Sequence, residues 1–428
     1  MIRDSKPGTL LAINNYFYRR GGPEAVFLDH IAMFEEIGWT VVPYAMRHEN
    51  NMESEWSDYF VSEIEYGRDA DRFRRIVQAA NVIYSVEAQR NLRRLIDRIR
   101  PSVAHAHNVY HHLSPSIFST LRASGIPTVM TVHDLKLACP AYKMLRDGKV
   151  CEDCRGGHVY NVLRHRCIKG SVSLSAVVLA ETVLHRILRT YRDKIDRLVV
   201  PSRFYIDKLA EWGWSRDQMV HIPNFVNAED FSPEWQEEGY FAFAGRLSEE
   251  KGIATLIRAA ARSGQRLVVA GTGPQQAELQ ALAKETGARV EFAGYVSGEA
   301  LHRLIGESLA LVLPSEWYEN APISVLEAYA LGRPVIGAGI GGIPELIRAG
   351  ETGVLAASGN VEDLARALSH IAGLAPAERK AMGAAGRSWV QREFSPYAYR
   401  DRMLSLYGTI SNRPFQIDTE AASHVNRP

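Results

Sequence analysis

The stretch "LALVLPSEWYENAPISVLEAYALGRPVIGAG" (Leu309–Gly339) contains two short apolar runs on either side of one helix-length segment. Pro322 suits the first turn of that helix, because proline has a fixed φ and its missing N–H would be unpaired there in any case. Gly332 followed by Pro334 is a typical helix end. A strand, a helix and a second strand in this order predict a βαβ unit, in which the two strands lie parallel.

Similar apolar runs recur along the chain and form two series. They are mostly continuous rather than alternating, as expected for strands buried between two layers of helices. The first series is "TLLAINNYF", "TVVPYAM", "VAHAHN", "PTVMTVHD", "RLVVPS" and "MVHIPN", and the second is "YFAFAG", "RLVVAG", "RVEFAG", "LALVLPS" and "PVIGAG". The polar segment Asn224–Gly239 separates them. The sequence therefore predicts an α/β protein with two doubly wound, Rossmann-like parallel-sheet domains.

The length and amino-acid composition are those of a soluble globular protein. With 428 residues the chain is too long for one ordinary core, and 46% of its residues are hydrophobic and 23% charged. Lys and Arg number 50 and Asp and Glu 49, so the net charge of +1 provides no field to attract nucleic acid, and no nucleic-acid partner is expected. No long apolar run follows the basic start of the chain, so we expect neither a signal peptide nor a spanning helix, and a cytoplasmic location.

Candidate ligand-binding residues lie where the strands of the second series end, because ligands bind outside the carboxyl ends of the strands in open parallel sheets. Glycine-rich loops follow three of these strands, and the fourth strand end supplies paired carboxylates, Glu319 in the loop and Glu327 in the helix after it. The loops are "AGRLSEEKG", "AGTGP", "PSEWYENAP" and "GAGIGGIPE".

The first of these loops brings two cations to a helix start. Gly245 lets the backbone approach a ligand, and Arg246 and Lys251 supply positive charge, which together favour a diphosphate. The alternative is that both cations pair with the neighbouring Glu249 and Glu250 at the surface. Because the helix predicted after Pro322 also favours an anion at its N-terminus, phosphate is the preferred interpretation.

The carboxylates Glu319 and Glu327 are unsuited to phosphate and suited to hydroxyl groups. Charge-assisted hydrogen bonds of this kind are worth ~1.5–3 kcal/mol each. The alternative is a solvated helix residue for Glu327 and a favourable charge near the helix N-terminus for Glu319. Beside a phosphate site, the two carboxylates predict a nucleotide sugar as ligand.

The motifs "GRLSEEKG", "VAGTGP", "PSEWYENAPISVLEAYALGRPVIG" and "GGIPELI", in this order, resemble those of the retaining nucleotide-sugar glycosyltransferases of family 4, which have the GT-B fold. The segment "RRGGPE" (Arg19–Glu24) resembles the family's N-terminal glycine loop, and "TVHD" its strand with a histidine, so the likeness covers nearly the whole chain. Many relatives carry Phe-Gly after the first glutamate, whereas this chain has Asn320, Ala321 and Pro322, so the donor stays undefined.

The resemblance implies a role for each matching residue. The acceptor would be held mainly by the N-terminal domain and the donor mainly by the C-terminal domain. Arg246 and Lys251 would neutralise the leaving diphosphate, Glu319 would contact the donor sugar, and His133 would face the anomeric carbon from the other domain. The implied donor-binding residues are Gly21, Gly22, Gly245, Gly271, Gly273, Asn320, Ile323, Ser324 and Glu327, of which Glu327 would hold the ribose hydroxyls. The implied chemistry is sugar transfer with retention and without an obligatory metal.

His133 ends the apolar strand "PTVMTVHD", where a polar side chain usually faces a ligand. The alternative is a buried histidine bonded to a backbone carbonyl. We expect His133 to face the crevice. For His105, His107, His111 and His112 the sequence predicts structural or acceptor-facing roles.

All four cysteines, Cys139, Cys151, Cys154 and Cys167, fall in one short segment. A CxxC pair with two flanking cysteines predicts a structural zinc site, because thiolates favour tetrahedral zinc. Disulfides are disfavoured by a cytoplasmic location, and free buried thiols are the remaining alternative.

The cysteine segment is also basic and precedes the apolar helix "SLSAVVLAETVLHRIL". One hypothesis is that loop and helix meet a lipid-linked, phosphate-bearing acceptor at the inner membrane surface, and the alternative is a solvated loop on a packed helix. The Arg-rich segment Arg68–Arg100 raises the same choice, and there a solvated helical face is preferred.

These interpretations give a domain map and a function. The map has an N-terminal domain (1–225) with a Cys-rich insertion (135–172), a C-terminal domain (226–395), a helix that crosses back (396–411) and a loose tail (412–428). The predicted function is transfer from a UDP- or GDP-sugar to a glycan or lipid-linked acceptor in surface polysaccharide synthesis, with no cofactor required for catalysis. The alternatives are a sugar-nucleotide epimerase or phosphorylase of the same fold and a nucleotide-sugar binding protein without turnover.

Overall fold

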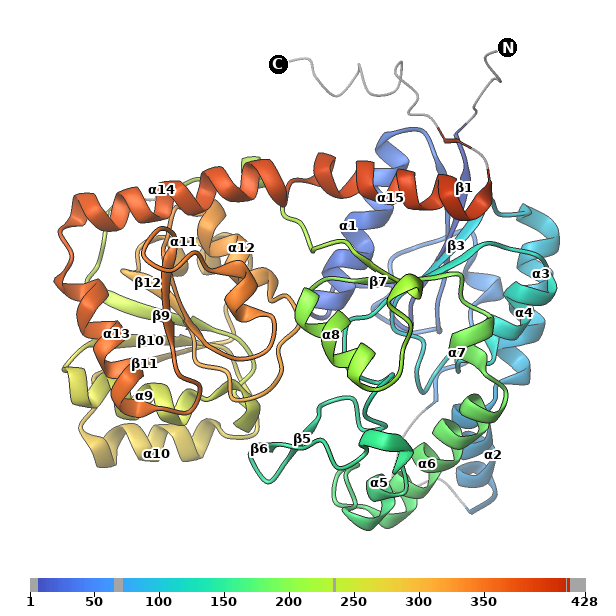
Figure 1. Cartoon of the computed structure of the whole chain (residues 1–428), viewed down its shortest axis with the longest axis horizontal. Helices are drawn as coiled ribbons and strands as arrows, with labels where there is room; N and C mark the ends of the chain where they lie inside the picture. The colour runs from blue at the N-terminus through green and yellow to red at the C-terminus, as the bar shows by residue number, and fades with distance from the viewer. Residues whose placement is uncertain (1–6, 65–71, 234–235, 413, 416–428) are drawn as a thin grey trace.

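Two parallel six-stranded sheets, each covered by helices, make up the protein (Figure 1). The structure is a computed structural model that describes residues 7–64, 72–233, 236–412 and 414–415, without the side chains of 72–76. Most of the predicted tail and residues 68–71 of the Arg-rich segment lie outside the described residues. The two-domain, Rossmann-like fold class predicted from the sequence is confirmed.

The N-terminal sheet has the strand order β2-β1-β3-β4-β7-β8, and every pairing is parallel. Its strands are β1 (Thr9–Ile13), β2 (Thr40–Tyr44), β3 (Val103–Ala106), β4 (Thr128–Thr131), β7 (Arg197–Val200) and β8 (Met219–His221). On β4, Val129 packs in one buried cluster and Met130 in another, one on each face of the sheet. Burial of both faces explains the continuous apolar runs.

The C-terminal sheet has the order β11-β10-β9-β12-β13-β14 and is also parallel. Its strands are β9 (Tyr240–Ala244), β10 (Arg266–Ala270), β11 (Val290–Gly294), β12 (Ala310–Leu313), β13 (Val335–Ala338) and β14 (Gly353–Ala356). All eleven predicted strands are present. The sequence interpretation missed β14 and the short hairpin of β5 (Leu145–Arg146) and β6 (Lys149–Val150) in the Cys-rich insertion.

Helices cover both faces of each sheet (Figure 1). Those of the first half are α1 (Gly22–Glu36), α2 (Arg72–Ile83), α3 (Val86–Ile99), α4 (Ile117–Ala123), α5 (Asn161–Arg164), α6 (Val172–Ile187), α7 (Thr190–Asp193) and α8 (Arg203–Glu211). Those of the second half are α9 (Ile253–Ser263), α10 (Gln276–Thr286), α11 (Gly298–Gly306), α12 (Ile323–Ala330), α13 (Val361–Gly373), α14 (Pro376–Glu393) and α15 (Pro396–Ser411). No helix in the described ranges is both long and apolar enough to cross a membrane.

The last helix returns to the first domain. In Figure 1, α14 lies along the second domain and α15 lies over the first, beside α1. Tyr399, Met403 and Tyr407 of α15 are buried in the same cluster as Phe27 and Phe34 of α1. The C-terminal helix therefore belongs to the core of the N-terminal domain.

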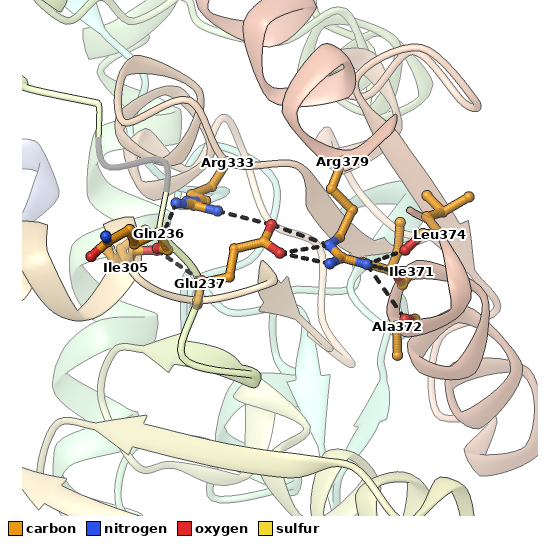
Figure 2. A network of polar contacts seen from close by, with 9 residues as sticks. Gln236, Glu237, Ile305, Arg333, Ile371, Ala372, Leu374 and Arg379 are labelled. Carbon is orange, nitrogen blue, oxygen red and sulfur yellow. Dashed lines mark hydrogen bonds and ion pairs between the residues drawn. The ribbon is translucent and has the colours of Figure 1, made fainter. Parts of the chain in front are cut away.

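An ionic cluster links the segment before the first strand of the second sheet to its surroundings. Figure 2 shows the carboxylate of Glu237 between the guanidinium groups of Arg333 and Arg379. Glu237 Oε1 lies 3.1 Å from Arg333 Nη1, and Oε2 lies 2.6 Å from Arg379 Nη2. Arg379 also donates to the carbonyl of Ile371 at the end of α13. One carboxylate thus ties the segment before β9 to the turn before β13 and to α14.

Candidate active site

The carboxylate of Glu319 lies in the loop after β12 and is bound by two donors. Lys251 Nζ, from the turn between β9 and α9, lies 2.7 Å from Glu319 Oε1, and Ser315 Oγ donates to the same oxygen at 2.8 Å. Glu319 is 7% exposed, whereas the side chain of Lys251 is 27% exposed, so the carboxylate is buried and the ammonium group is partly open to solvent. Two residues that the sequence assigned to one site from separate loops are therefore in direct contact.

The surface pairing considered for the first loop is not found. Glu250 accepts instead from Lys143 of the Cys-rich insertion, at 3.0 Å across the gap between the domains. Arg246 is exposed, and its guanidinium makes no hydrogen bond or ion pair within the described residues. Its charge lowers the pKa of Tyr142, although burial of Tyr142 has the larger, opposite effect. Arg246 thus retains its full donor capacity for a ligand.

Glycines let the strand-end loops of the second sheet touch one another. A Cβ on Gly271 would lie 1.9 Å from the carbonyl oxygen of Gly245, and one on Gly273 would lie 2.2 Å from that of Leu247. A Cβ on Gly342 would lie 1.8 Å from the carbonyl oxygen of Asn320. In this structure the glycines pack one loop on the next. The phosphate-binding role predicted for Gly245, Gly271 and Gly273 remains a prediction.

The N-terminus of α12 lies beside the N-terminal glycine loop. Pro322 occupies the N-cap and offers no side-chain acceptor, so no side chain caps the first N–H groups, which include those of Ile323 and Ser324. A Cβ on Gly22 would lie 3.7 Å from Ile323 Cδ1, which places the predicted glycine loop, Gly21 and Gly22, against this helix start. This arrangement suits an anion held between the two.

Glu327 lies one turn further along α12 and is partly buried. Burial raises the pKa of its carboxyl group, Arg19 counteracts this, and Asp29 adds to it. Arg19 and Asp29 belong to the first domain and are themselves paired. Glu327 therefore faces the other domain, as a group that contacts a ligand between the domains must.

Asn320 bridges the two domains directly. Its Nδ2 donates to the carbonyl oxygen of Val132 at 2.8 Å and to that of His133 at 3.4 Å, and its Oδ1 accepts from Ser202 Oγ at 2.8 Å. The departure from the family's Phe-Gly pattern thus supplies an interdomain contact. It fixes the loop after β12 beside the end of the His133 strand.

The side chain of His133 is bonded to another histidine, not to a backbone carbonyl. His133 Nε2 lies 2.8 Å from His107 Nδ1, and burial lowers the pKa of His133 to about 3. His107 Nε2 is buried and has no hydrogen-bond partner within the described residues. A buried N–H without an acceptor is costly, so the proton of His107 belongs on Nδ1. His133 then accepts at Nε2 and carries its own proton on Nδ1.

Three more buried groups continue this histidine chain beneath the site. The ring of His105 stacks on that of His107 with centroids 4.6 Å apart. His105 Nδ1 lies 2.6 Å from the hydroxyl of Tyr407 in α15, and that hydroxyl lies 3.1 Å from His30 Nε2. Of the two roles predicted for His105 and His107, structural or acceptor-facing, these contacts fit the structural one. No sequence pattern indicated that Tyr407 of the C-terminal helix would bond to these histidines.

The four cysteines are free thiols in one neighbourhood. Burial raises the pKa of Cys139 to about 11 and that of Cys154 to about 12, and Cys151 and Cys167 add to the effect on Cys154. In the described part of the chain no group of three or more His, Cys, Asp or Glu side chains is placed to hold a metal ion. The predicted zinc site is therefore unsupported. Cys139 and Cys167 instead pack against a small apolar cluster.

Two family comparisons together cover most of the chain. The family described as "Glycosyltransferase Family 4" matches residues 20–230, and that described as "Glycosyl transferases group 1" matches residues 226–389. Their junction falls between the last strand of the first sheet and the first strand of the second.

Similar curated proteins match over part of their length. An uncharacterized glycosyltransferase of Methanocaldococcus jannaschii is 35% identical over 35% of this chain and 38% of its own length. A GDP-mannose-dependent monoacylated alpha-(1-6)-phosphatidylinositol monomannoside mannosyltransferase of Corynebacterium glutamicum is 27% identical over 51% of this chain and 64% of its own. A D-inositol 3-phosphate glycosyltransferase of Actinosynnema mirum is 35% identical over 50% of this chain and 57% of its own length. The chain thus spans less than two thirds of these relatives.

Solved structures match over nearly the whole chain. Sucrose-phosphate synthase of Thermosynechococcus elongatus has a TM-score of 0.68 at 20% identity and covers 94% of this chain and 99% of its own. Anabaena HepE in complex with UDP and glucose has a TM-score of 0.66 at 15% identity, and the match covers 94% of this chain and 100% of HepE. At such identities the likeness concerns the fold.

Proposed function

Since the chain belongs to the group 1, family 4 type of glycosyltransferases with the GT-B fold, we propose that it transfers a sugar, with retention of configuration, from a UDP- or GDP-sugar to a glycan or lipid-linked acceptor. One observation carries the proposal, the meeting of the two domains around a charged pair. The Lys251–Glu319 ion pair lies in the loops around the start of α12. From the other domain, Gly22 and the end of the His133 strand contact these loops.

The proposed reaction needs positive charge where the leaving phosphate forms. Breaking a glycosyl–phosphate bond puts negative charge on the phosphate and positive charge on the sugar. Arg246, Lys251 and the first N–H groups of α12 would stabilise the former, since such preorganised donors lower the barrier. Glu319 holds the ammonium group of Lys251 in place and leaves one carboxylate oxygen for a sugar hydroxyl.

The remaining donor contacts follow from the same arrangement. Glu327 would accept hydrogen bonds from the ribose hydroxyls, because its carboxylate lies one turn inside the phosphate-binding end of α12. His133, which carries its proton on Nδ1, would donate to an oxygen of the donor sugar or of the phosphate. In this proposal no divalent metal is assigned a role, since cations and helix donors supply the charge.

The acceptor is proposed to carry a phosphate or a glycan, and the setting to be surface polysaccharide synthesis in the cytoplasm. Support for a phosphate-bearing acceptor comes from two of the relatives, which are named for phosphatidylinositol monomannoside and for D-inositol 3-phosphate. A peripheral contact with the inner membrane surface is part of this proposal, since such acceptors can be lipids.

Donor turnover tests the proposal. The protein is incubated with a panel of UDP- and GDP-sugars, and released UDP or GDP is measured with and without a mixture of glycan and lipid-linked acceptors. Release that rises with an acceptor, with an α-linked product from an α-linked donor, supports retaining transfer. Interconversion of free nucleotide sugars would point to an epimerase, and binding without chemistry to a nucleotide-sugar binding protein. Either result refutes the proposal.

A further inference from the structure

The Cys-rich insertion of the first domain contacts the two loops of the second domain that carry Lys251 and Glu319. In Figure 1 its hairpin, β5 and β6, points from the first domain toward the second. The hairpin is anchored in its own domain, because Met144, which directly precedes it, is 1% exposed and belongs to a core cluster of the first sheet. The insertion thus belongs to the core of one domain and reaches loops of the other.

Lys143 bonds the residue that precedes Lys251. Lys143 Nζ lies 3.0 Å from Glu250 Oε1, and the Glu250 side chain is 10% exposed. The carbonyl oxygen of Glu250 accepts from the backbone N–H of Glu316 at 2.9 Å, so Glu250 also joins the loop after β12. An ion pair with one partner this buried is screened less by water and salt than a surface pair. Lys143 therefore holds the short turn Glu249–Lys251 from the opposite domain.

Glu152 bonds the residue that precedes Glu319. Its Oε1 accepts from the hydroxyl of Tyr318 at 3.0 Å and from Lys208 Nζ of α8 at 2.8 Å. The carbonyl oxygen of Tyr318 accepts from the hydroxyl of Tyr205, also on α8, at 3.0 Å. Tyr318 is therefore held through its side chain and through its backbone, and both bonds come from the first domain.

The tip of the hairpin makes a third contact. Gly148 has a φ of 70°, and a Cβ there would lie 2.6 Å from Glu249 Oε1. A side chain at this position would strain the backbone and press on the turn that carries Lys251. Lys143 and Glu152 lie on the two sides of the same hairpin, and among the described residues they bond to the second domain and not to each other. One hairpin thus supplies a contact to each of the two loops.

We propose that the Cys-rich insertion is a positioning element of the candidate active site, with Lys143 and Glu152 as its positioning residues. Each bonds the chain neighbour of one member of the Lys251–Glu319 ion pair, and neither is assigned a contact with the nucleotide sugar. Because these bonds cross between the domains, the ion pair is held in place only while the domains are together. The inference rests on the proposed function, since the position of Lys251 matters where a leaving phosphate forms.

A small displacement of Lys251 is enough for a large effect. Its ammonium group sits on a flexible four-carbon stem, so the surrounding turn decides where the charge lies. A misplacement of about 1 Å can cost ~10²-fold in rate. Because negative charge develops on the phosphate in the transition state, the loss should appear in kcat more than in KM.

Steady-state release of the nucleotide diphosphate tests the inference. Lys143→Met and Glu152→Ala should each lower kcat roughly tenfold to hundredfold and change KM for the nucleotide sugar by less than about threefold. Lys143→Arg keeps a cation for Glu250 and should recover most of the loss. Lys149→Met, at an exposed position of the same hairpin, is the matched control and should turn over like the parent protein. Parental kcat in both Lys143→Met and Glu152→Ala refutes the inference.

A double variant separates positioning from a general loss of structure. In the Lys251→Ala protein the positioned group is gone, so the addition of Lys143→Met should lower kcat by less than about twofold further. Two independent effects would multiply instead. A multiplied loss contradicts the inference, because Lys143 would then act by a route that does not pass through Lys251.

Amide hydrogen exchange gives a readout that does not depend on turnover. In the protein without nucleotide, exchange should be at least about threefold faster in peptides covering 245–252 for Lys143→Met and in those covering 316–320 for Glu152→Ala. Lys149→Met should exchange like the parent protein. Unchanged exchange in both variants overturns the inference even where the parent protein is active.

The two measurements also distinguish this inference from the proposed function. A parent protein that releases nucleotide from no donor would refute the proposed function, while faster exchange in the variants would still support the ordering of the two loops by the insertion. An active parent protein whose hairpin variants are equally active and exchange alike would refute the inference alone.

Discussion

His133 Nε2 lies 2.8 Å from His107 Nδ1, beneath the point where the two domains meet. The unpartnered Nε2 of His107 places the proton of that ring on Nδ1, so the bond fixes both the tautomer and the orientation of His133. Through this bond His107 determines which ring nitrogen of His133 can donate a hydrogen bond to a ligand.

The first prediction concerns this bond. His107→Phe removes the hydrogen-bond donor to His133. We expect kcat to fall roughly tenfold to hundredfold, because the partner that orients a functional histidine is lost. KM for the nucleotide sugar should change little. His107→Asn, whose amide can take the place of Nδ1–H, should retain most activity. His370→Asn, at an exposed position on α13, is the control. Equal activity of the Phe and Asn variants at His107 would show that the bond has no such role.

The second prediction concerns the charged pair at the strand ends. Lys251→Ala should lower turnover by roughly 10²–10³, because it removes a cation from the leaving phosphate. It also leaves Glu319 with Ser315 as its remaining side-chain donor. Steady-state release of the nucleotide diphosphate measures the effect, and Lys284→Ala, on the exposed side of α10, serves as the control. A variant at Lys251 with parental turnover would contradict the assignment.

The third prediction concerns Glu327 and pH. Since burial raises the pKa of its carboxyl group, the carboxylate is lost at a higher pH than in an ordinary glutamate. Donor affinity should therefore fall as the pH is lowered, and start to fall above the usual range of a glutamate. Glu327→Ala should weaken donor binding about tenfold at neutral pH. Glu327→Gln should bind with little dependence on pH, whereas Glu362→Gln, an exposed control on α13, should follow the parent protein.

The fourth prediction concerns the buried histidine chain. Burial lowers the pKa of His30 and of His133 to about 3, and lowers the pKa of His105 and His107 well below the ordinary value. Below about pH 6.5 the unfolded chain binds more protons than the folded one, so the free energy of unfolding should decrease as the pH is lowered. Each group contributes up to about 1.4 kcal/mol per pH unit. Urea unfolding at pH 7, 6 and 5 measures the slope, and His370→Asn should not change it.

The fifth prediction concerns the ionic cluster around Glu237. Glu237→Ala leaves two buried guanidinium groups, Arg333 and Arg379, without their shared carboxylate, and should destabilise the second domain by on the order of 3 kcal/mol. Glu238→Ala, which removes the adjacent exposed carboxylate, should change the free energy of unfolding by less than about 0.5 kcal/mol. Denaturant unfolding of the two variants makes the comparison, and equal midpoints would mean that the cluster adds no stability.

Much of the fold could be predicted because its signals are local. Continuous apolar runs predicted eleven of the twelve strands of the two sheets, and Pro322 and Gly332 predicted the bounds of α12 to within two residues. β14 was missed because its four residues follow a turn and two of them are only partly buried or exposed. The cysteine spacing predicted a metal site that the arrangement of the described residues does not support. Spacing reports which residues are close in the chain, not how their side chains are aimed.

The sequence by itself determined the two parallel sheets and the strand-end loops that carry Lys251 and Glu319, because strand burial and helix ends depend on neighbours within a few residues. Only the tertiary structure decided that Asn320 bonds the strand of His133 and that Tyr407 of the last helix bonds His105. These partners lie 188 and 302 positions apart in the chain. Their contact depends on how whole domains and the returning helix pack, and no local pattern contains that information.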